Sequence, residues 1–219
     1  MKPRTQPYVH KIESIATGVS TELQALLSAV PLPSVTAPKQ RESVKFESAS
    51  AQPIPAMIYL ITFACYGCRL HGDTAGSVDR AHNLPGSPLL EARPARVAAE
   101  LRKMDQPPYD MDCNRRAVVL AALLERCQQQ GWKLLAAHVR TNHTHMVVEA
   151  EDRPERVMND VKSYASRLLN RMGLDGTGRK RWARHGSTRW LWKPEHVSAA
   201  IHYVVEEQGE RMAVFEASG

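Results

Sequence analysis

The sequence predicts an α+β fold of the ferredoxin-like, split βαβ type, with an antiparallel sheet and an added C-terminal helix. After residue 56, apolar β-rich segments alternate with segments of helical periodicity in the order strand, helix, strand, strand, helix, strand, helix. The two middle strands are separated only by a tight turn at residues 140–142, and strands joined in this way pair antiparallel. No internal repeat suggests another architecture.

The first predicted strand covers residues 57–64, because MIYLITFA is apolar and rich in β-forming residues. Residues 65–111 then carry many prolines and glycines, with a short helix expected at 93–104. A long insertion of this kind in a compact domain is more often functional than idle. Residues 1–55 are rich in Pro, Ser, Thr and Ala and are expected to be a flexible extension, so the folded domain is expected to be 56–219.

Regular structure is expected to resume at Asp112, which suits the N-cap of a helix over residues 115–130. Gly131 is expected to end that helix. Residues 132–139 and 143–150 are then the second and third predicted strands.

The C-terminal third has a further helix, strand and helix in its pattern. One helix is expected to open at Pro154 and end at Gly173, with its apolar residues on one stripe. A glycine-rich basic loop at 173–186 precedes a predicted strand at 187–192. The last helix is expected over residues 194–208, with proline at its first position and a glycine after its end.

Composition excludes several classes of protein. The chain of 219 residues is 43% hydrophobic, and no segment approaches the ~20 apolar residues of a membrane span. The N-terminus lacks the apolar core of a signal peptide, so we expect a cytoplasmic, nucleoid-associated protein with no membrane partner. Four cysteines do not make a disulfide framework, and Cys65 and Cys68 are expected to be free thiols at a strand end.

The most distinctive chemical feature is the pair His143 and His145. Residues two apart on a strand point to the same face, so both imidazoles should project together. Two neutral imidazoles held side by side make half of a divalent-metal site, although two solvent-exposed histidines would show the same spacing. His138 on the neighbouring strand could be a further ligand or a core residue.

The last helix carries a candidate nucleophile, Tyr203, beside the apolar stripe. Glu207 follows one turn later and could complete a site of two histidines and a carboxylate, which would place the phenol beside the metal. A phenol near a cation ionises more readily and can act as a nucleophile. Tyr164 is a rival, but it falls on the apolar stripe of its own helix and is expected in the core.

Positive charge is concentrated between residues 162 and 193, where nine basic residues and one acid occur. The net charge of the whole chain is only +6. Tryptophans are interleaved with these charges, and unpaired bases stack on such rings while cations follow the phosphates. The alternative is a solvated basic loop with its tryptophans in the core. The candidate DNA contacts are Lys162, Arg167, Arg171, Arg179, Lys180, Arg181, Arg184, Arg189 and Trp190.

Together these residues resemble the single-tyrosine HUH transposases, the insertion-sequence group that includes the REP-associated tyrosine transposases. The resemblance spans about residues 57–215. It is carried by TFACYGCRLHGD (62–73), GWKLLAAHVRTNHTHMVV (131–148), VKSYASRLLN (161–170), HGSTRWLW (185–192) and IHYVVEEQ (201–208).

The resemblance implies that His143, His145 and a polar residue on the tyrosine helix bind Mg²⁺ or Mn²⁺. The third ligand usually lies four residues after the tyrosine, which is Glu207 here. Many members have Gln or Asn at that offset, whereas Gln208 of this chain is five residues away, so Glu207 is preferred on helical geometry. Asn142 is a candidate for supporting the site from outside the ligand set.

The expected function is metal-dependent nicking of single-stranded DNA and strand transfer in transposition, through a 5′-phosphotyrosine on Tyr203. Family members form homodimers and recognise DNA hairpins, so both are expected here. Two alternatives stay open: a domesticated relative that binds or cleaves hairpin DNA, and a non-catalytic nucleic-acid-binding protein of the same fold.

Overall fold

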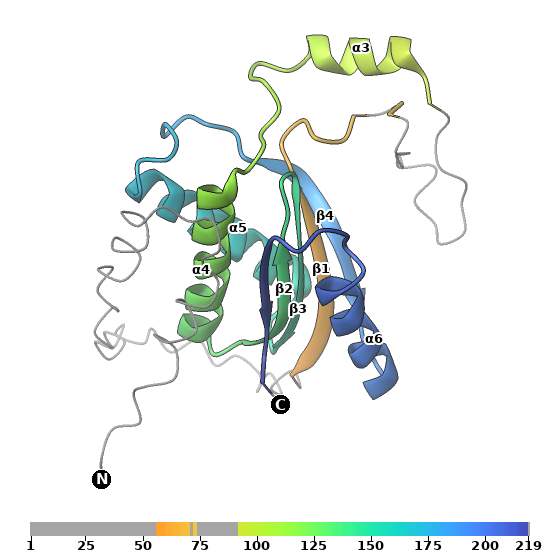
Figure 1. The fold of residues 1–219 in the computed structure, drawn as a ribbon, viewed down its shortest axis with the longest axis vertical. Coiled ribbons are helices and arrows are strands. Elements are labelled where there is room, and N and C mark those ends of the chain that lie inside the picture. Colours follow the sequence, from red (N-terminus) through yellow and green to blue (C-terminus); the bar gives the residue numbers. More distant parts are fainter. Residues whose placement is uncertain (1–55, 71, 74–91, 219) are drawn as a thin grey trace, which may run out of the picture.

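The computed structural model describes residues 56–70, 72–73 and 92–218 (Figure 1). The expected N-terminal extension and much of the insertion after the first strand lie outside the described residues. In the described part, one five-stranded antiparallel sheet has the strand order β4-β1-β3-β2-β5. The first four strands have the ferredoxin-like order, which confirms the predicted fold class.

The strands are β1 (Met57–Cys65), β2 (Lys133–Val139), β3 (His143–Ala150), β4 (Trp182–Trp190) and β5 (Ala213–Glu216). The helices of the described part are α3 (Pro94–Arg102), α4 (Cys113–Gln130), α5 (Pro154–Arg171) and α6 (Pro194–Val205). The largest differences from expectation are in the C-terminal part. Strand β5 was not predicted, β4 begins at Trp182 rather than at residue 187, and α6 ends at Val205 rather than at residue 208.

Helix α4 shows how local sequence sets the element boundaries. The Asp112 carboxylate accepts a hydrogen bond from the backbone N–H of Arg115 at 2.8 Å, which satisfies one of the free N–H groups of the first turn. Gly131 ends the helix with φ of 72°, a left-handed conformation that glycine adopts without steric penalty. Both of these predicted boundary residues are confirmed.

The two faces of the sheet are covered unequally. Helices α4 and α5 cover one face of the sheet (Figure 1). Residues of β1 such as Ile61 and Phe63 belong to the core on that face. The alternate residue Leu60 points to the opposite face, where α6 packs with the buried side chains of Ala200 and Val204. The second face is therefore covered by one helix in the described part of the chain, and the candidate site lies there.

None of the described helices is long and apolar enough to cross a membrane. The cysteines are free thiols, as expected: Cys65 is buried at the end of β1, and Cys68 follows in the next turn. Burial raises the pKa of both thiols, so they are not activated nucleophiles.

Candidate active site

The two histidines of the HxH pair lie side by side on β3. This strand is bracketed by β1 and β2, so its backbone is hydrogen-bonded on both sides. The ring centroids of His143 and His145 are 4.8 Å apart and the rings meet edge to face at 84°. Because both side chains leave a strand in the middle of the sheet, their separation is set by the pleat and not by a loop.

Each imidazole has a hydrogen-bond partner at Nδ1. The Nδ1 of His143 is 2.7 Å from Oδ1 of Asn142, and the Nδ1 of His145 is 2.7 Å from Oγ1 of Thr62. An amide oxygen can only accept, so His143 donates from Nδ1 and keeps a lone pair at Nε2. The Thr62 hydroxyl can accept in the same way. This pattern of outer partners is the one that orients metal-binding histidines.

Both histidines are held in the neutral form. Burial, together with the positive charges of Arg69 and Arg140, lowers the pKa of His143 to about 4. Burial and the neighbouring His143 lower the pKa of His145 to about 3. A histidine must be deprotonated to bind a metal, so at neutral pH no proton has to be removed from either ring.

Helix α6 places Tyr203 directly beside this pair. The ring centroids of Tyr203 and His145 are 5.5 Å apart at 80°, and Tyr203 is 38% exposed. The phenol and both imidazoles therefore belong to one chain and one surface. The rival Tyr164 packs against the core on the α5 side and accepts a hydrogen bond from Gln129, away from the histidines.

Glu207 lies one turn after Tyr203, as expected: its backbone N–H donates to the Tyr203 carbonyl at 3.3 Å, although α6 itself ends at Val205. Its carboxylate is exposed and lies 3.4 Å from Nε2 of His202. Its role as a metal ligand stays a prediction. The side chain of Gln208 instead donates to the Tyr203 carbonyl at 2.9 Å and forms a hydrogen bond with His143. Gln208 is thus the polar side chain that reaches the histidines from this turn.

His138 is a core residue in the structure and not a further ligand. It is fully buried, and its Nδ1 lies 3.0 Å from the Val204 carbonyl at the end of α6. Its Nε2 accepts from the backbone N–H of Met212 at 3.3 Å. Both ring nitrogens are therefore occupied, and the ring ties the end of the tyrosine helix to β2. No group of three His, Cys, Asp or Glu side chains suited to a metal occurs among the described residues.

Residues 112–207, which include both histidines and Tyr203, match the family model described as Transposase IS200 like. This part of the chain is therefore similar to the IS200-like transposases. The similarity supports a DNA-processing function related to transposition. No curated protein matches the sequence.

Two solved structures resemble this chain. One is a REP-associated tyrosine transposase bound to a REP hairpin, with 8% identity, a TM-score of 0.40, and coverage of 74% of this chain and 72% of that chain. The other is a provisionally assigned transposase from Deinococcus radiodurans, with 17% identity, a TM-score of 0.32, and coverage of 74% of this chain and 98% of that chain.

Two of the basic residues expected to contact DNA are buried inside the domain. Arg181 is 4% exposed, and its Nε donates to the Asp175 carboxylate at 2.9 Å. Lys162 is 6% exposed and donates to the Ala183 and His185 carbonyls at 3.2 Å each, which holds the irregular part of β4. The expectation that Lys162 and Arg181 contact DNA is therefore corrected, since their donors are used within the protein.

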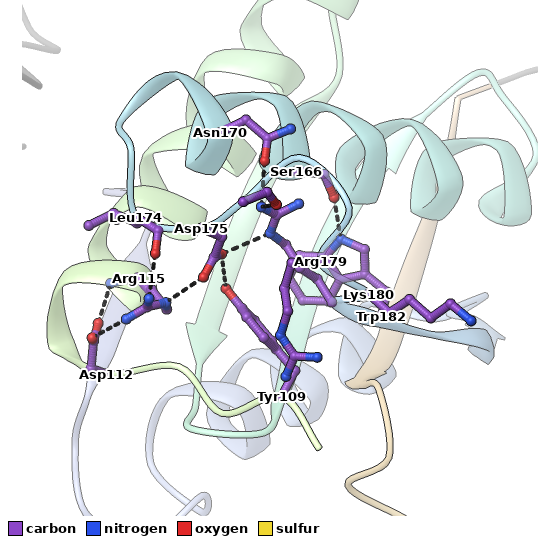
Figure 2. A network of polar contacts seen from close by, with 12 residues as sticks. Tyr109, Asp112, Arg115, Ser166, Asn170, Leu174, Asp175, Arg179, Lys180 and Trp182 are labelled. Carbon is purple, nitrogen blue, oxygen red and sulfur yellow. Dashed lines mark hydrogen bonds and ion pairs between the residues drawn. The ribbon is translucent and has the colours of Figure 1, made fainter. Parts of the chain in front are cut away.

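The Asp175 carboxylate is the centre of a polar network (Figure 2). Besides Arg181, it accepts from the Tyr109 hydroxyl at 2.6 Å and from Nε of Arg115 at 3.1 Å. Burial opposes ionisation of Asp175, but the hydrogen bonds from these three side chains outweigh it and lower the pKa of the carboxyl. The only acid of the basic segment thus fixes the loop after α5 to the start of α4.

Arg179 and Lys180 also have hydrogen-bond or ion-pair partners within the protein. Arg179 donates to the carbonyls of Pro107 and Pro108, and Lys180 pairs with Asp105 at the exposed surface. The candidate DNA contacts that are exposed are Arg167, Arg171, Lys180, Arg184, Arg189 and Trp190, of which Lys180 is paired with Asp105. The sequence could not show these pairings because the partner segment lies about seventy residues away.

Trp190 forms an exposed aromatic pair with Trp192. Their rings stack at 5.2 Å with an interplanar angle of 7°, and Trp192 is 68% exposed. The Trp190 ring also meets the ring of Tyr59 edge to face, with the ring centroids 4.9 Å apart. Because Tyr59 belongs to the core on the α5 side of the sheet, Trp190 lies on that side, opposite Tyr203. The third tryptophan of the segment, Trp182, packs on Phe63 and belongs to the core periphery.

The sequence did not predict that Thr62, Arg69 and Arg140 lie beside the histidines. Thr62 pairs with His145 across β1 and β3, so the alternation of β1 would have identified it once the register was known. The turn after β1 is joined to the β2–β3 turn by a hydrogen bond from the Cys65 N–H to the Asn142 carbonyl at 2.8 Å. Through this contact Arg69 comes close enough for its charge to act on both imidazoles.

Proposed function

We propose that this protein nicks single-stranded DNA and transfers the strand end, with Tyr203 as the nucleophile and a divalent metal as cofactor. The observation that carries the proposal is the contact of Tyr203 with His145, whose ring lies against that of His143. A lone tyrosine beside two neutral, oriented imidazoles is the arrangement that metal-assisted attack by a phenol requires.

The side chains fit a divalent cation such as Mg²⁺ or Mn²⁺. Asn142 and Thr62 contact Nδ1 of His143 and His145, so neither of them occupies the Nε2 atoms with which the two rings would hold the cation. The Gln208 amide adds an oxygen, the ligand type that Mg²⁺ and Mn²⁺ favour. When bound, the cation supplies Lewis-acid polarisation of a phosphate oxygen.

The chemistry on this chain is then one displacement at phosphorus. The Tyr203 oxygen loses its proton and forms a bond to the phosphorus atom, and the bond from phosphorus to the 3′ oxygen breaks. The products are a 5′-phosphotyrosine and a free 3′-hydroxyl. Attack by another 3′-hydroxyl reverses the step and joins strands, because the phosphodiester energy is retained in the tyrosine ester.

The geometry also bears on the expected dimer. Tyr203 meets the histidines of its own chain, so one chain carries every group that the proposal uses. We therefore propose that the tyrosine acts in cis. Dimerisation and hairpin DNA as the natural substrate remain predictions from the family.

The proposal is tested with a fluorescent hairpin oligonucleotide that has single-stranded flanks, incubated with the protein and MnCl₂ and resolved on a denaturing gel. A covalent protein–DNA adduct is expected with the wild type and with Tyr164→Phe, which changes a tyrosine on the opposite face. It should be absent with Tyr203→Phe or with EDTA. An adduct in Tyr203→Phe would refute the assignment, and metal-independent binding with no adduct would favour a non-catalytic hairpin-binding protein.

A further inference from the structure

A groove of ≈ 440 Å³ runs between α6 and the edge strand β4 and reaches Tyr203. We propose that this groove binds one unpaired nucleotide of single-stranded DNA next to the phosphate that Tyr203 attacks. The inference rests on the proposed function and adds to it a base-binding site. The lining residues are Leu60, Thr62, Ser187, Arg189, Leu191, His196, Ala199, Ala200 and Tyr203.

The groove combines an apolar floor with a basic rim. Leu60, Leu191 and Ala200 form the floor and belong to the apolar cluster under α6. Arg189 and His196 line the rim, and no acidic side chain is among the described residues that line it. An apolar floor beside a cation suits a ligand with an apolar ring face and a negative charge, which is the chemistry of a nucleotide.

Arg189 is the cation best placed to hold the phosphate. It is exposed on β4, and within the described part of the chain its guanidinium has no hydrogen bond or ion pair to another side chain. This distinguishes it from Arg179, Lys180 and Arg181, whose donors are used internally. A guanidinium without a protein partner can donate two parallel hydrogen bonds to phosphate oxygens.

The position of the groove explains why its occupant would be the nucleotide beside the cleaved bond. Tyr203 lines the groove and also contacts His145, and Thr62 lines it while its hydroxyl lies 2.7 Å from Nδ1 of His145. The groove and the histidine pair are therefore one continuous surface. Because β4 is an edge strand, the groove lies at the side of the sheet, where a DNA strand can enter from solvent.

The proposal is tested by fluorescence anisotropy in EDTA, so that binding is measured without chemistry. The probes are fluorescein-labelled oligothymidylate and an abasic deoxyribose-phosphate strand of the same length. Ala199→Leu fills the groove from an exposed helical position, and leucine is a good helix former. We expect it to weaken oligothymidylate binding about tenfold, the effect of losing one buried base, and to leave abasic-strand binding unchanged.

A second variant distinguishes the contact with the phosphate from the contact with the base, and a third serves as the control. Arg189→Gln should weaken binding of both probes, because the phosphate contact is common to them. Ser198→Leu is the matched control, since this neighbouring residue on α6 is exposed and does not line the groove. It should bind both probes as the wild type does.

The outcomes distinguish the groove from the nuclease proposal. If Ala199→Leu binds oligothymidylate as tightly as the wild type and Ser198→Leu do, the groove proposal is wrong even where the wild type forms a covalent adduct. If the wild type forms no adduct with Mn²⁺ but Ala199→Leu selectively loses base binding, the groove stands and the nuclease proposal fails.

Discussion

Replacing Asp175 with alanine is expected to lower the free energy of unfolding by about 3–5 kcal/mol, because it leaves a buried guanidinium without a counter-charge. The side chains of Asp175 and Arg181 are 6% and 3% exposed, so water cannot replace the lost partner. A domain of this size has a total stability of roughly 5–15 kcal/mol, and the loss would be a large fraction of it.

A second variant shows whether the unpaired charge is the cause. Adding Arg181→Met to Asp175→Ala removes the buried cation, so the double variant should be more stable than Asp175→Ala alone. The remaining partner Arg115 is 25% exposed and can be hydrated, which limits the residual loss. Tyr109 would lose one hydrogen bond, worth about 1 kcal/mol.

Urea unfolding followed by tryptophan fluorescence measures these differences. Asp112→Ala is the control, because this carboxylate is 50% exposed and caps α4, where a loss of about 1 kcal/mol is typical. The reasoning is refuted if Asp175→Ala costs no more than Asp112→Ala, or if the double variant is less stable than Asp175→Ala.

The same carboxylate gives a dependence on pH. The folded state lowers the pKa of Asp175, so its contribution is fully present above the ordinary aspartate pKa and is lost as pH falls through the folded value. The stability difference between the wild type and Asp175→Ala should therefore shrink only under acid conditions, below about pH 4. A difference that shrank between pH 7 and pH 5 would contradict this sign.

Three further outcomes follow from particular contacts. If His143 binds the metal as proposed, Asn142→Ala should weaken Mn²⁺ binding about 10- to 100-fold in an EPR titration, because this histidine loses its outer hydrogen-bond partner. Arg184→Gln should reduce the slope of log affinity against log salt by about 0.7 for single-stranded DNA, whereas the buried Lys162→Met should leave it unchanged. Gly186→Ala should lower the free energy of unfolding by roughly 1–3 kcal/mol, since an added Cβ would lie 2.5 Å from the Thr62 carbonyl of β1. The control Gly176→Ala should not show this loss, because a Cβ there meets no atom within 4 Å.

Most of the fold could be predicted because each main element carries its own periodicity and boundary residues. Asp112 and Gly131 set the limits of α4, and β3 has the predicted bounds. Strand β5 was missed because four residues are too few to show alternation. The start of β4 was missed because its basic and glycine residues are typical of a loop. In the structure Lys162 donates a hydrogen bond to the Ala183 carbonyl and stabilises this part of the strand.

The candidate site was only partly predictable. Strand geometry predicts that His143 and His145 lie on the same face of the sheet. The contact of His145 with Tyr203 agrees with the pattern of the family that the sequence resembles. Helical spacing predicted the backbone position of Glu207 one turn after Tyr203, but it could not show that the Glu207 carboxylate lies beside His202. Charge counting likewise could not reveal which cations are buried, because pairing depends on segments distant in the chain.

The two imidazoles lie on β3 and the phenol of Tyr203 lies on α6, and these two elements should differ in local stability. Strand β3 is hydrogen-bonded on both sides and lies beneath helices on both faces, so its amides should exchange with deuterium only when the whole domain unfolds. Helix α6 packs on one face, and much of its surface is in solvent. Its amides should exchange through local opening, which would move Tyr203, the proposed nucleophile, away from the sheet while the histidine pair stays assembled.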